Sequence, residues 1–319
     1  MEKLPEGPVT IPELDALGFG AAEMARLVRR GALRRVFRGV FVSAGCALTP
    51  ELRCRCLAKV LPPNAVVCDH TAAGLWGIDV HSASSMDAPP DVDVVLVGAH
   101  RSTRLPGTFG GKRALTPDDV VTLHGIQVTS PLRTACDLAC RRSRRQALAV
   151  LDAFARAHGL TKADYRRMAR RFRGRRGVVQ LRELIEYVDP RAESIRESWV
   201  RIEIVDSGLP VPDLQVWVEL PGLGRVRLDL AYRGRRIAIE YDGEEFHSSP
   251  AARSADELRR RLLREAGWIV IVVRREDLKG ERLDAWLGLL RRSYDERSPA
   301  RTRRYASAPR ERRPLGHRR

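Results

Sequence analysis

The last third of the chain carries the pattern that most restricts its fold. Apolar side chains at helical spacing in ESIRESWVRIEIVDSGLP precede three segments rich in branched apolar residues, LQVWVEL, RVRLDLAY and IAIEYD. A helix over AARSADELRRRLLREAG, a buried strand over WIVIVV and a helix over ERLDAWLGLLRRS complete the order. Three strands, a helix, a strand and a helix after the first helix predict a sheet flanked by helices.

The second and third of these strands predict a hairpin that separates apolar residues from acids. A turn centred on Arg233 and Gly234 pairs Tyr232 with Arg235, and therefore Asp229 with Ala238 and Arg227 with Glu240. An odd loop would pair an apolar face with a polar one, so the pattern selects this register. The apolar face then holds Val226, Leu228, Leu230, Ile237, Ile239 and Tyr241, and the other face holds Asp229, Glu240 and Asp242.

Three carboxylates on one sheet face need a cationic partner. An oxygen-liking metal ion, Mg²⁺ or Mn²⁺, would offset their repulsion, and so would ion pairs with Arg227 and Arg236 on the same face. We favour the metal, because Mg²⁺ sites typically use one or two carboxylates plus a substrate phosphate. In the following helix, Arg259 and Arg260 are expected to contact that phosphate.

The order Asp229, then Glu240-Tyr-Asp242-Gly243, His247, a helix and GWIVIVVRREDL resembles the Vsr-like endonuclease domain, a relative of very-short-patch repair endonucleases with the PD-(D/E)xK fold. The resemblance implies a Mg²⁺-dependent DNA phosphodiesterase. It implies Glu197, Asp229 and Glu240 as metal ligands and Asp229, Glu240, Asp242 and His247 as catalytic residues. Asp242 replaces the usual lysine, which leaves water activation to the metal and to His247; a plain surface histidine is the other interpretation of His247.

Residues 8–45 predict a winged helix-turn-helix. Thr10 is a helix cap before IPELDALG, GFGAAEMARLVRRGAL predicts a second helix, and RRVFRGVFV predicts a basic hairpin. The alternative is a helical hairpin packed on the next domain. The segment LVRRGALRRVFRGVFV also resembles the N-terminal domain of AbiEi-type antitoxins of abortive-infection systems. The expected DNA contacts are Arg26, Arg29, Arg30, Arg34, Arg35 and Arg38.

The chain as a whole is expected to be α/β and multidomain. We predict a winged helix-turn-helix over 1–46, a mixed α/β linker domain over 47–190, the endonuclease-like domain over 191–296 and a disordered basic tail over 297–319. The six cysteines lack paired zinc-site spacing and are expected to be buried thiols. The basic run YRRMARRFRGRRG has two interpretations: it follows a phosphate backbone, or it is a solvated helix face.

The formal net charge of +17 fits a polyanionic partner. We therefore expect a cytoplasmic protein without a membrane segment that binds DNA and cleaves it with Mg²⁺, with a toxin or repair partner possible. The alternative is a winged-helix transcriptional regulator or antitoxin in which the nuclease fold survives as a non-catalytic binding module. The sequence does not determine the substrate or the oligomeric state.

Overall fold

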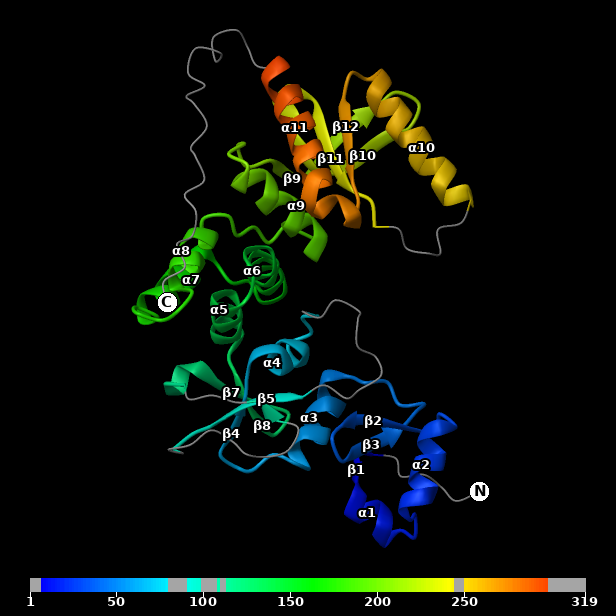
Figure 1. The fold of residues 1–319 in the computed structure, drawn as a ribbon, viewed down its shortest axis with the longest axis vertical. Coiled ribbons are helices and arrows are strands. Elements are labelled where there is room, and N and C mark those ends of the chain that lie inside the picture. The colour runs from blue at the N-terminus through cyan, green and yellow to red at the C-terminus, as the bar shows by residue number, and fades with distance from the viewer. Residues whose placement is uncertain (1–6, 80–90, 99–107, 110–112, 244–249, 298–319) are drawn as a thin grey trace. The chain divides into compact units, whose positions relative to one another are not determined.

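The computed structural model describes residues 7–79, 91–98, 108, 109, 113–243 and 250–297 (Figure 1). It confirms a mixed α/β protein with several sheets. The chain divides into two compact units, Met1–Trp199 and Val200–Arg319. His247 and residues 298–319 of the expected tail lie outside what is described.

The first unit begins with two short helices and a small sheet. The elements are β1 (Val9–Thr10), α1 (Ile11–Ala16), α2 (Ala21–Arg29), β2 (Leu33–Phe37) and β3 (Val40–Ser43), and the sheet order is β1-β3-β2. Thr10 caps α1 as expected, because the Glu13 carboxylate accepts hydrogen bonds from Thr10 N at 2.8 Å and from Thr10 Oγ1 at 2.9 Å. The β2–β3 turn contains Gly39 with a φ of 78°, a conformation that suits glycine.

The β2–β3 hairpin contributes side chains to two hydrophobic clusters. Leu33 and Phe41 pack with Leu14, Phe19 and Met24 of the α1–α2 region. A second cluster contains Val36, Phe37, Val40 and Val42 of the hairpin together with residues of the sheet that follows in the sequence, such as Val67, Val92 and Val128. The apolar core is therefore continuous across residue 46, where the helical hairpin region meets the mixed domain.

A five-stranded sheet forms the next layer, in the order β6-β5-β4-β8-β7. Its strands are β4 (Ala65–Val67), β5 (Val92–Leu96), β6 (Thr108–Phe109), β7 (Val120–Leu123) and β8 (Ile126–Thr129). Between them lie α4 (Asp69–Leu75) and the 3-10 turn η1 (Pro117–Asp119), and α3 (Pro50–Ala58) precedes β4. Thr49 caps α3 by accepting a hydrogen bond from Leu52 N at 3.1 Å.

Four helices complete most of the first unit: α5 (Pro131–Arg141), α6 (Arg144–His158), α7 (Lys162–Arg171) and α8 (Val178–Ile185). Helix α5 starts at a Ser-Pro pair, with Ser130 as the cap and Pro131 in the first turn, which is the expected chemistry of a helix start. Helix α9 (Ile195–Asp206) crosses the division between the two units.

The second unit contains a four-stranded sheet between helices, as the sequence pattern predicts (Figure 1). Its strands are β9 (Asp213–Leu220), β10 (Gly224–Tyr232), β11 (Ile237–Tyr241) and β12 (Ile269–Val273), in the order β12-β11-β10-β9. The remaining elements are η2 (Arg233–Arg235), α10 (Pro250–Glu265), η3 (Arg275–Leu278) and α11 (Gly280–Glu296). Strands β11 and β12 are parallel and the other pairs are antiparallel.

The register of the β10–β11 hairpin differs from the expected one by two residues. Tyr232 pairs with Ile237 and Leu230 with Ile239, so the loop holds four residues and not two. The reason is local: residues 233–235 form a 3-10 turn, and Arg236 follows in the left-handed region with a φ of 49°. The loop length stays even, and the register, continued by one residue, brings Asp229 opposite Glu240.

The expected separation of faces along β10 is also incomplete. Val226 and Leu228 belong to the cluster that contains Ala231 and Ala238, so strict alternation is lost between Leu228 and Ala231. The interruption coincides with the neighbouring strand β9, where Gln215 has a φ of 54° and the pairing passes from Leu228 to Leu230. A residue in this conformation interrupts the pleat, which shifts side chains between the two faces.

The six cysteines are free thiols, and Cys54, Cys56, Cys68 and Cys136 are buried as expected, whereas Cys46 and Cys140 are only half-buried. Burial raises the pKa of Cys54 to about 11, so its thiolate is disfavoured. None of the helices in the described parts of the chain is long and apolar enough to cross a membrane.

Candidate nucleic-acid interface

Helix α2 holds its basic face outward because its apolar residues are anchored in the core. Met24 is buried and Leu27 is partly buried against the cluster of Leu14, Phe19 and Leu33. Arg26, Arg29 and Arg30 are exposed at and just beyond the end of the helix. Positive side chains in the last turn also interact favourably with the helix dipole.

The β2–β3 hairpin extends this basic surface. Arg34 and Arg35 are exposed in β2, and Arg38 is exposed in the turn before Gly39. Leu33, Val36 and Phe37 of the same strand are buried, and the pairing with β3 shifts between Arg35 and Phe37, so this strand does not alternate strictly. We call the six exposed arginines the N-terminal basic surface; they are Arg26, Arg29, Arg30, Arg34, Arg35 and Arg38.

Two of the six arginines are engaged within the protein. Arg26 Nε donates to Glu23 Oε2 at 2.7 Å, and Arg34 Nη2 donates to the carbonyl oxygen of Cys46 at 2.6 Å. The other four guanidinium groups have no ion-pair or hydrogen-bond partner among the described residues; they are Arg29, Arg30, Arg35 and Arg38. Their donors are free to bind phosphate oxygens.

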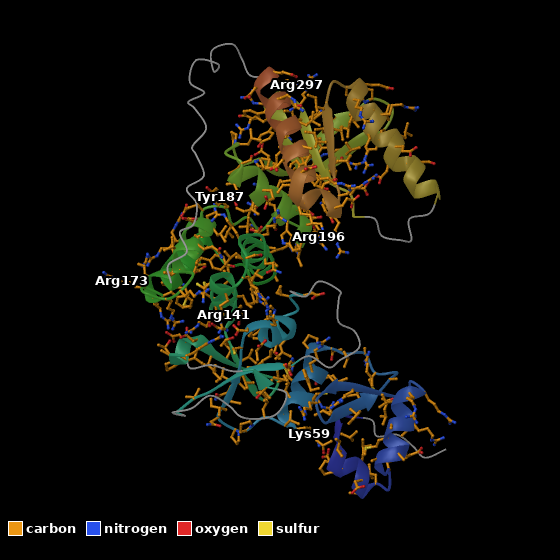
Figure 2. All side chains as sticks on the ribbon, in the orientation of Figure 1. Lys59, Arg141, Arg173, Tyr187, Arg196 and Arg297 are labelled. Atoms are coloured by element: carbon orange, nitrogen blue, oxygen red, sulfur yellow. The ribbon has the colours of Figure 1, made fainter. Side chains whose placement is uncertain are left out.

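Several arginines of the second basic stretch, residues 165–176, form ion pairs within the protein. Arg166 pairs with Glu186 at 2.7 Å, Arg167 with Asp164 at 2.6 Å and Arg171 with Asp119 at 2.7 Å. Arg173, labelled in Figure 2, is exposed. These contacts favour the interpretation that this run serves helix packing and solvation over a continuous phosphate track.

In the second unit, arginines surround the acids that the sequence singles out. Glu240 is 2% exposed, and Arg259 Nη1 lies 2.9 Å from its Oε1 while Arg260 Nε lies 3.3 Å from its Oε2. Arg260 Nη2 also lies 3.2 Å from Asp242 Oδ2. Burial lowers the pKa of Arg260, but the charges of Glu240 and Asp242 outweigh this effect and raise it. Both arginines are thus ion-paired with acids of the expected site.

The remaining expected site residues have different surroundings. Asp229 lies half-buried in β10, one residue before Leu230, which pairs with Ile239 of β11. Glu197 belongs to the first unit, where its Oε2 accepts a hydrogen bond from Glu193 N at 3.0 Å and closes the start of α9. Within the described residues, no three His, Cys, Asp or Glu side chains lie close enough to hold a metal ion. The metal and catalytic assignments stay predictions.

The first unit contains a buried ionic network that sequence reasoning missed. Arg133, fully buried, donates from Nη1 to Asp119 Oδ2 at 2.8 Å and from Nε to Asp137 Oδ2 at 2.7 Å. Arg171 donates to both oxygens of Asp119, at 2.9 and 2.7 Å. Arg113 pairs with Asp137 at 3.1 Å and also with Asp69. Buried charges persist only when they are paired in this way.

The network has an outer edge at which charges reach solvent. Arg141, labelled in Figure 2, donates from Nη1 to Asp69 Oδ2 at 2.6 Å while its side chain remains 59% exposed. The guanidinium groups of Arg133 and Arg175 lie 5.1 and 4.3 Å from the centre of the Phe172 ring. A signal was available in the sequence: Arg133 and Asp137 are four residues apart in α5, among small and apolar residues.

The comparisons with known proteins concern the same region. Residues 65–187 match the family described as AbiEi antitoxin C-terminal domain. This stretch runs from β4 to just beyond α8, and it contains the whole ionic network. The fold is that of a multidomain α/β protein, and residues 65–187 of it are similar to the AbiEi antitoxin C-terminal domain.

Two relatives from Mycobacterium tuberculosis cover most of the chain. They are Uncharacterized protein MT2308 of strain CDC 1551 / Oshkosh and Uncharacterized protein Rv2248 of strain H37Rv. Each is 33% identical over 256 residues, which is 80% of this chain and 90% of the relative. The chain belongs to the family of these two mycobacterial proteins.

Proposed function

We propose that the protein is a DNA-binding regulator of the AbiEi antitoxin type. The observation that carries the proposal is the N-terminal basic surface, where four arginines have no partner among the described residues. The AbiEi match over residues 65–187 supports it, because that domain is described as part of an antitoxin. We therefore favour an antitoxin function over a DNA-cleaving one.

The arrangement of α1, α2 and the β2–β3 hairpin suits a winged helix-turn-helix. In such a domain a helix enters the major groove while flanking basic residues bind the phosphate backbone. Here α2 is the groove-binding helix, with Arg26, Arg29 and Arg30 toward the DNA. The turn residue Arg38 and the strand residues Arg34 and Arg35 bind phosphates on the wing side. The charge of these six side chains supplies affinity, and base contacts by α2 supply specificity.

A cognate toxin is the proposed protein partner. The proposal rests on the antitoxin description of residues 65–187, since an antitoxin acts by opposing a toxin. The buried pairs around Arg133 and Asp119 give this region a rigid framework. Co-purification with the product of the adjacent gene tests the partner, and a product that stays unbound and non-toxic would contradict it.

DNA binding is tested with a labelled duplex from upstream of the protein's own gene. Arg29→Ala combined with Arg30→Ala removes two unpartnered guanidinium groups, and we expect affinity to fall about tenfold or more, at roughly 1.4 kcal/mol per factor of ten. Fluorescence anisotropy at fixed salt measures the change. The double variant Arg275→Ala with Arg292→Ala, two exposed arginines of the second unit, is the charge-matched control and should bind as the wild type does. Equal affinities of all three proteins would contradict the proposal.

A metal-dependent DNA endonuclease of the PD-(D/E)xK type is the second candidate. Its specific support is the β10–β11 register, which, if continued by one residue beyond Leu230 and Ile239, would bring Asp229 opposite Glu240. The ligands in the second unit would be Asp229 and Glu240, and a Mg²⁺ held there would polarise a scissile phosphate. Against it, Arg259 and Arg260 already neutralise Glu240, so the observed arrangement does not fit a divalent ion. We therefore favour a non-catalytic binding module.

Cleavage of supercoiled DNA distinguishes these two readings of the second unit. The main proposal predicts no nicking above the no-metal background when Mg²⁺ or Mn²⁺ is added at about 5–10 mM. Nicking that requires the metal and disappears in Glu240→Gln would overturn it in favour of the nuclease. Asp284→Asn, an exposed acid in α11, controls for nonspecific loss.

A further inference from the structure

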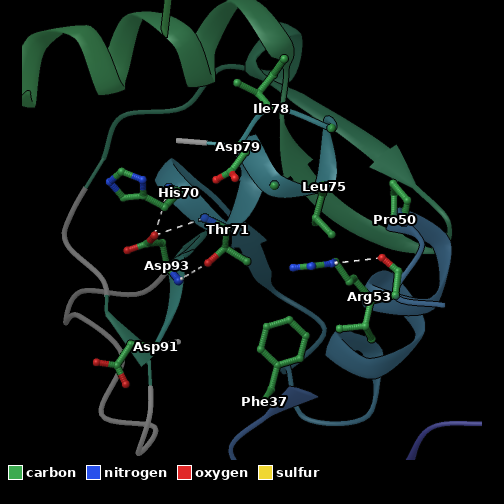
Figure 3. A pocket seen from close by; sticks show the side chains of 13 residues that line it. Phe37, Pro50, Arg53, His70, Thr71, Leu75, Ile78, Asp79, Asp91 and Asp93 are labelled. Atoms are coloured by element: carbon green, nitrogen blue, oxygen red, sulfur yellow. Dashed lines mark hydrogen bonds between the residues drawn. The ribbon is translucent and has the colours of Figure 1, made fainter. Parts of the chain in front are cut away.

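Two of the acids that line a pocket of about 670 Å³ in the first unit are engaged within the protein (Figure 3). The pocket is lined by the end of β2, the start of α3, helix α4 with the residues after it, and the start of β5. Asp93 Oδ2 accepts hydrogen bonds from His70 N at 3.0 Å and Thr71 N at 3.3 Å, and Asp79 has a partner of its own. These carboxylates therefore do not indicate a ligand, whereas a surface of the second unit does.

The β9–β10 hairpin has one face in the core and one face that is exposed. Val216, Val226 and Leu228 of the two strands pack in a hydrophobic cluster. Because side chains alternate along a strand, their neighbours lie on the opposite face. We call this opposite face the β9–β10 outer face; its four exposed residues are Trp217, Glu219, Arg225 and Arg227.

Trp217 gives the β9–β10 outer face an accessible aromatic ring. Of the five tryptophans, all of which lie within the described residues, Trp217 alone is exposed, at 44%. An indole is a flat apolar surface on which another ring can stack. The side chain is therefore available to a ligand that contains rings.

Three arginines contact Trp217. The Cζ atoms of Arg225 and Arg227 lie 4.6 and 5.8 Å from the centre of its ring, which is the geometry of a cation–π contact. Arg233, which follows β10, donates from Nη2 to the carbonyl oxygen of Trp217 at 3.0 Å. The aromatic ring is thus surrounded by positive charge and still keeps almost half of its residue's surface exposed.

Two of these arginines retain unused donors. Arg225 has no hydrogen-bond or ion-pair partner among the described residues, although Glu219 lies directly opposite it in the strand pairing. The exposed Arg233 has one hydrogen bond within the described parts of the chain, through one of its two terminal nitrogens. A planar guanidinium that stacks through its face can still donate N–H groups to phosphate oxygens.

These features restrict the kind of partner. Three arginines against Glu219 give the surface around Trp217 a positive balance, which favours an anionic partner. An apolar protein surface would meet mostly charged side chains here. A nucleic-acid duplex offers phosphates, but its bases are stacked inside and would leave the indole unused. An unpaired strand offers both phosphates and free base faces.

We propose that the β9–β10 outer face binds single-stranded DNA, with a base stacked on Trp217 and flanking phosphates bound by Arg225 and Arg233. Guanidinium groups bind phosphates without selecting the sugar, so a deoxyribose strand meets every requirement of the face. Every base has a face that can stack, and binding is therefore expected to tolerate any sequence. The proposal goes beyond duplex binding by the N-terminal basic surface and does not depend on it.

Titration of the full chain with an oligothymidine of about 12 nucleotides tests the proposal. Stacking on the exposed tryptophan should quench part of the protein's tryptophan fluorescence, and a blunt duplex of equal length should not. Trp217→Leu should abolish the quenching and weaken oligothymidine binding about tenfold, whereas Trp217→Phe keeps an aromatic face and should retain most of the affinity. Fluorescence anisotropy of the labelled oligonucleotide measures the affinities.

The arginines are tested in the same assay. Arg225→Ala combined with Arg233→Ala should weaken oligothymidine about tenfold, while the charge-matched Arg275→Ala with Arg292→Ala should bind as the wild type does. Thermal unfolding at the wild-type temperature shows that each variant is folded. Replacing the four unpartnered arginines of the N-terminal basic surface by alanine should leave the quenching intact, which separates this face from the proposed duplex-binding surface.

Three results would overturn the proposal. The first is the absence of quenching when wild-type protein is titrated with oligothymidine. The second is equal oligothymidine affinity of the wild type and the Arg225 and Arg233 double variant. The third is quenching by a polyglutamate peptide but not by oligothymidine, which would assign the face to an acidic protein partner.

Discussion

Asp119 is fully buried and accepts hydrogen bonds from Arg133, from Arg171 and from Thr116 N at 2.9 Å. Burial alone would raise its pKa, but the hydrogen bonds from Arg171 and Thr116 and the charge of Arg133 outweigh burial and lower the pKa. The preceding residue, Asp118, shows the contrast, because it is exposed. Which charged residues of this protein are buried and ion-paired is therefore hard to predict from the sequence.

The lowered pKa of Asp119 predicts how stability depends on pH. The unfolded carboxyl titrates near pH 4, so the ionised, paired carboxylate stabilises the fold above that pH and this stabilisation is lost as pH falls through the lower folded pKa. We expect Asp119→Asn to lower the free energy of unfolding by about 3 kcal/mol at pH 7 and to reduce the loss of stability in acid.

Urea denaturation between roughly pH 2 and pH 7 measures both effects. The neighbouring Asp118→Asn is the control, with an expected change below about 0.5 kcal/mol because Asp118 is exposed. If both variants lose stability equally, or if the acid limb of Asp119→Asn matches the wild type, the account of the ionic network is wrong.

Helix α8 meets the end of α5 at Gly177, the N-cap of α8, which has a φ of 81°. A Cβ atom built at Gly177 would overlap the carbonyl group of Cys140. Gly174, three residues earlier, has a similar φ of 79°, but a Cβ there would meet nothing within 4 Å. The two glycines share the conformational requirement and differ only in the close approach of another element.

This pair predicts two different costs. Gly174→Ala should destabilise by about 1 kcal/mol through its left-handed backbone alone. Gly177→Ala should cost about 1–3 kcal/mol more, because α8 must move away from α5. Thermal unfolding of both variants measures the difference. Equal losses of stability would show that the contact between α5 and α8 is looser than described.

Local signals explain which elements were predictable. Helix starts are indicated by Thr10 with Glu13 and by Ser130 with Pro131. Signals of this kind allowed most helices and strands to be recognised from the sequence. The β10–β11 register was not, because Arg236 adopts a left-handed conformation that no residue preference indicates. Strand β4, which is only three residues long, was too short to show a period.

Across the whole chain, the sequence predicted the exposure of side chains within one segment better than contacts between distant segments. The arginines of residues 26–38 share a helix and a hairpin, so their exposure could be expected from these two segments alone. The pairing of Glu240 with Arg259 and Arg260 depends on how α10 packs on β11, and the pocket depends on four separate elements. Neither is encoded in local spacing, and both required the structure.

The central claim is that the N-terminal basic surface binds DNA, and the salt dependence of binding tests it most directly. Each phosphate contact contributes about 0.9 to the slope of log affinity against log salt concentration. Replacing Arg29, Arg30, Arg35 and Arg38 by alanine should therefore reduce the slope for the upstream duplex by about 3 to 4. A variant that retains the wild-type slope and affinity would contradict the claim.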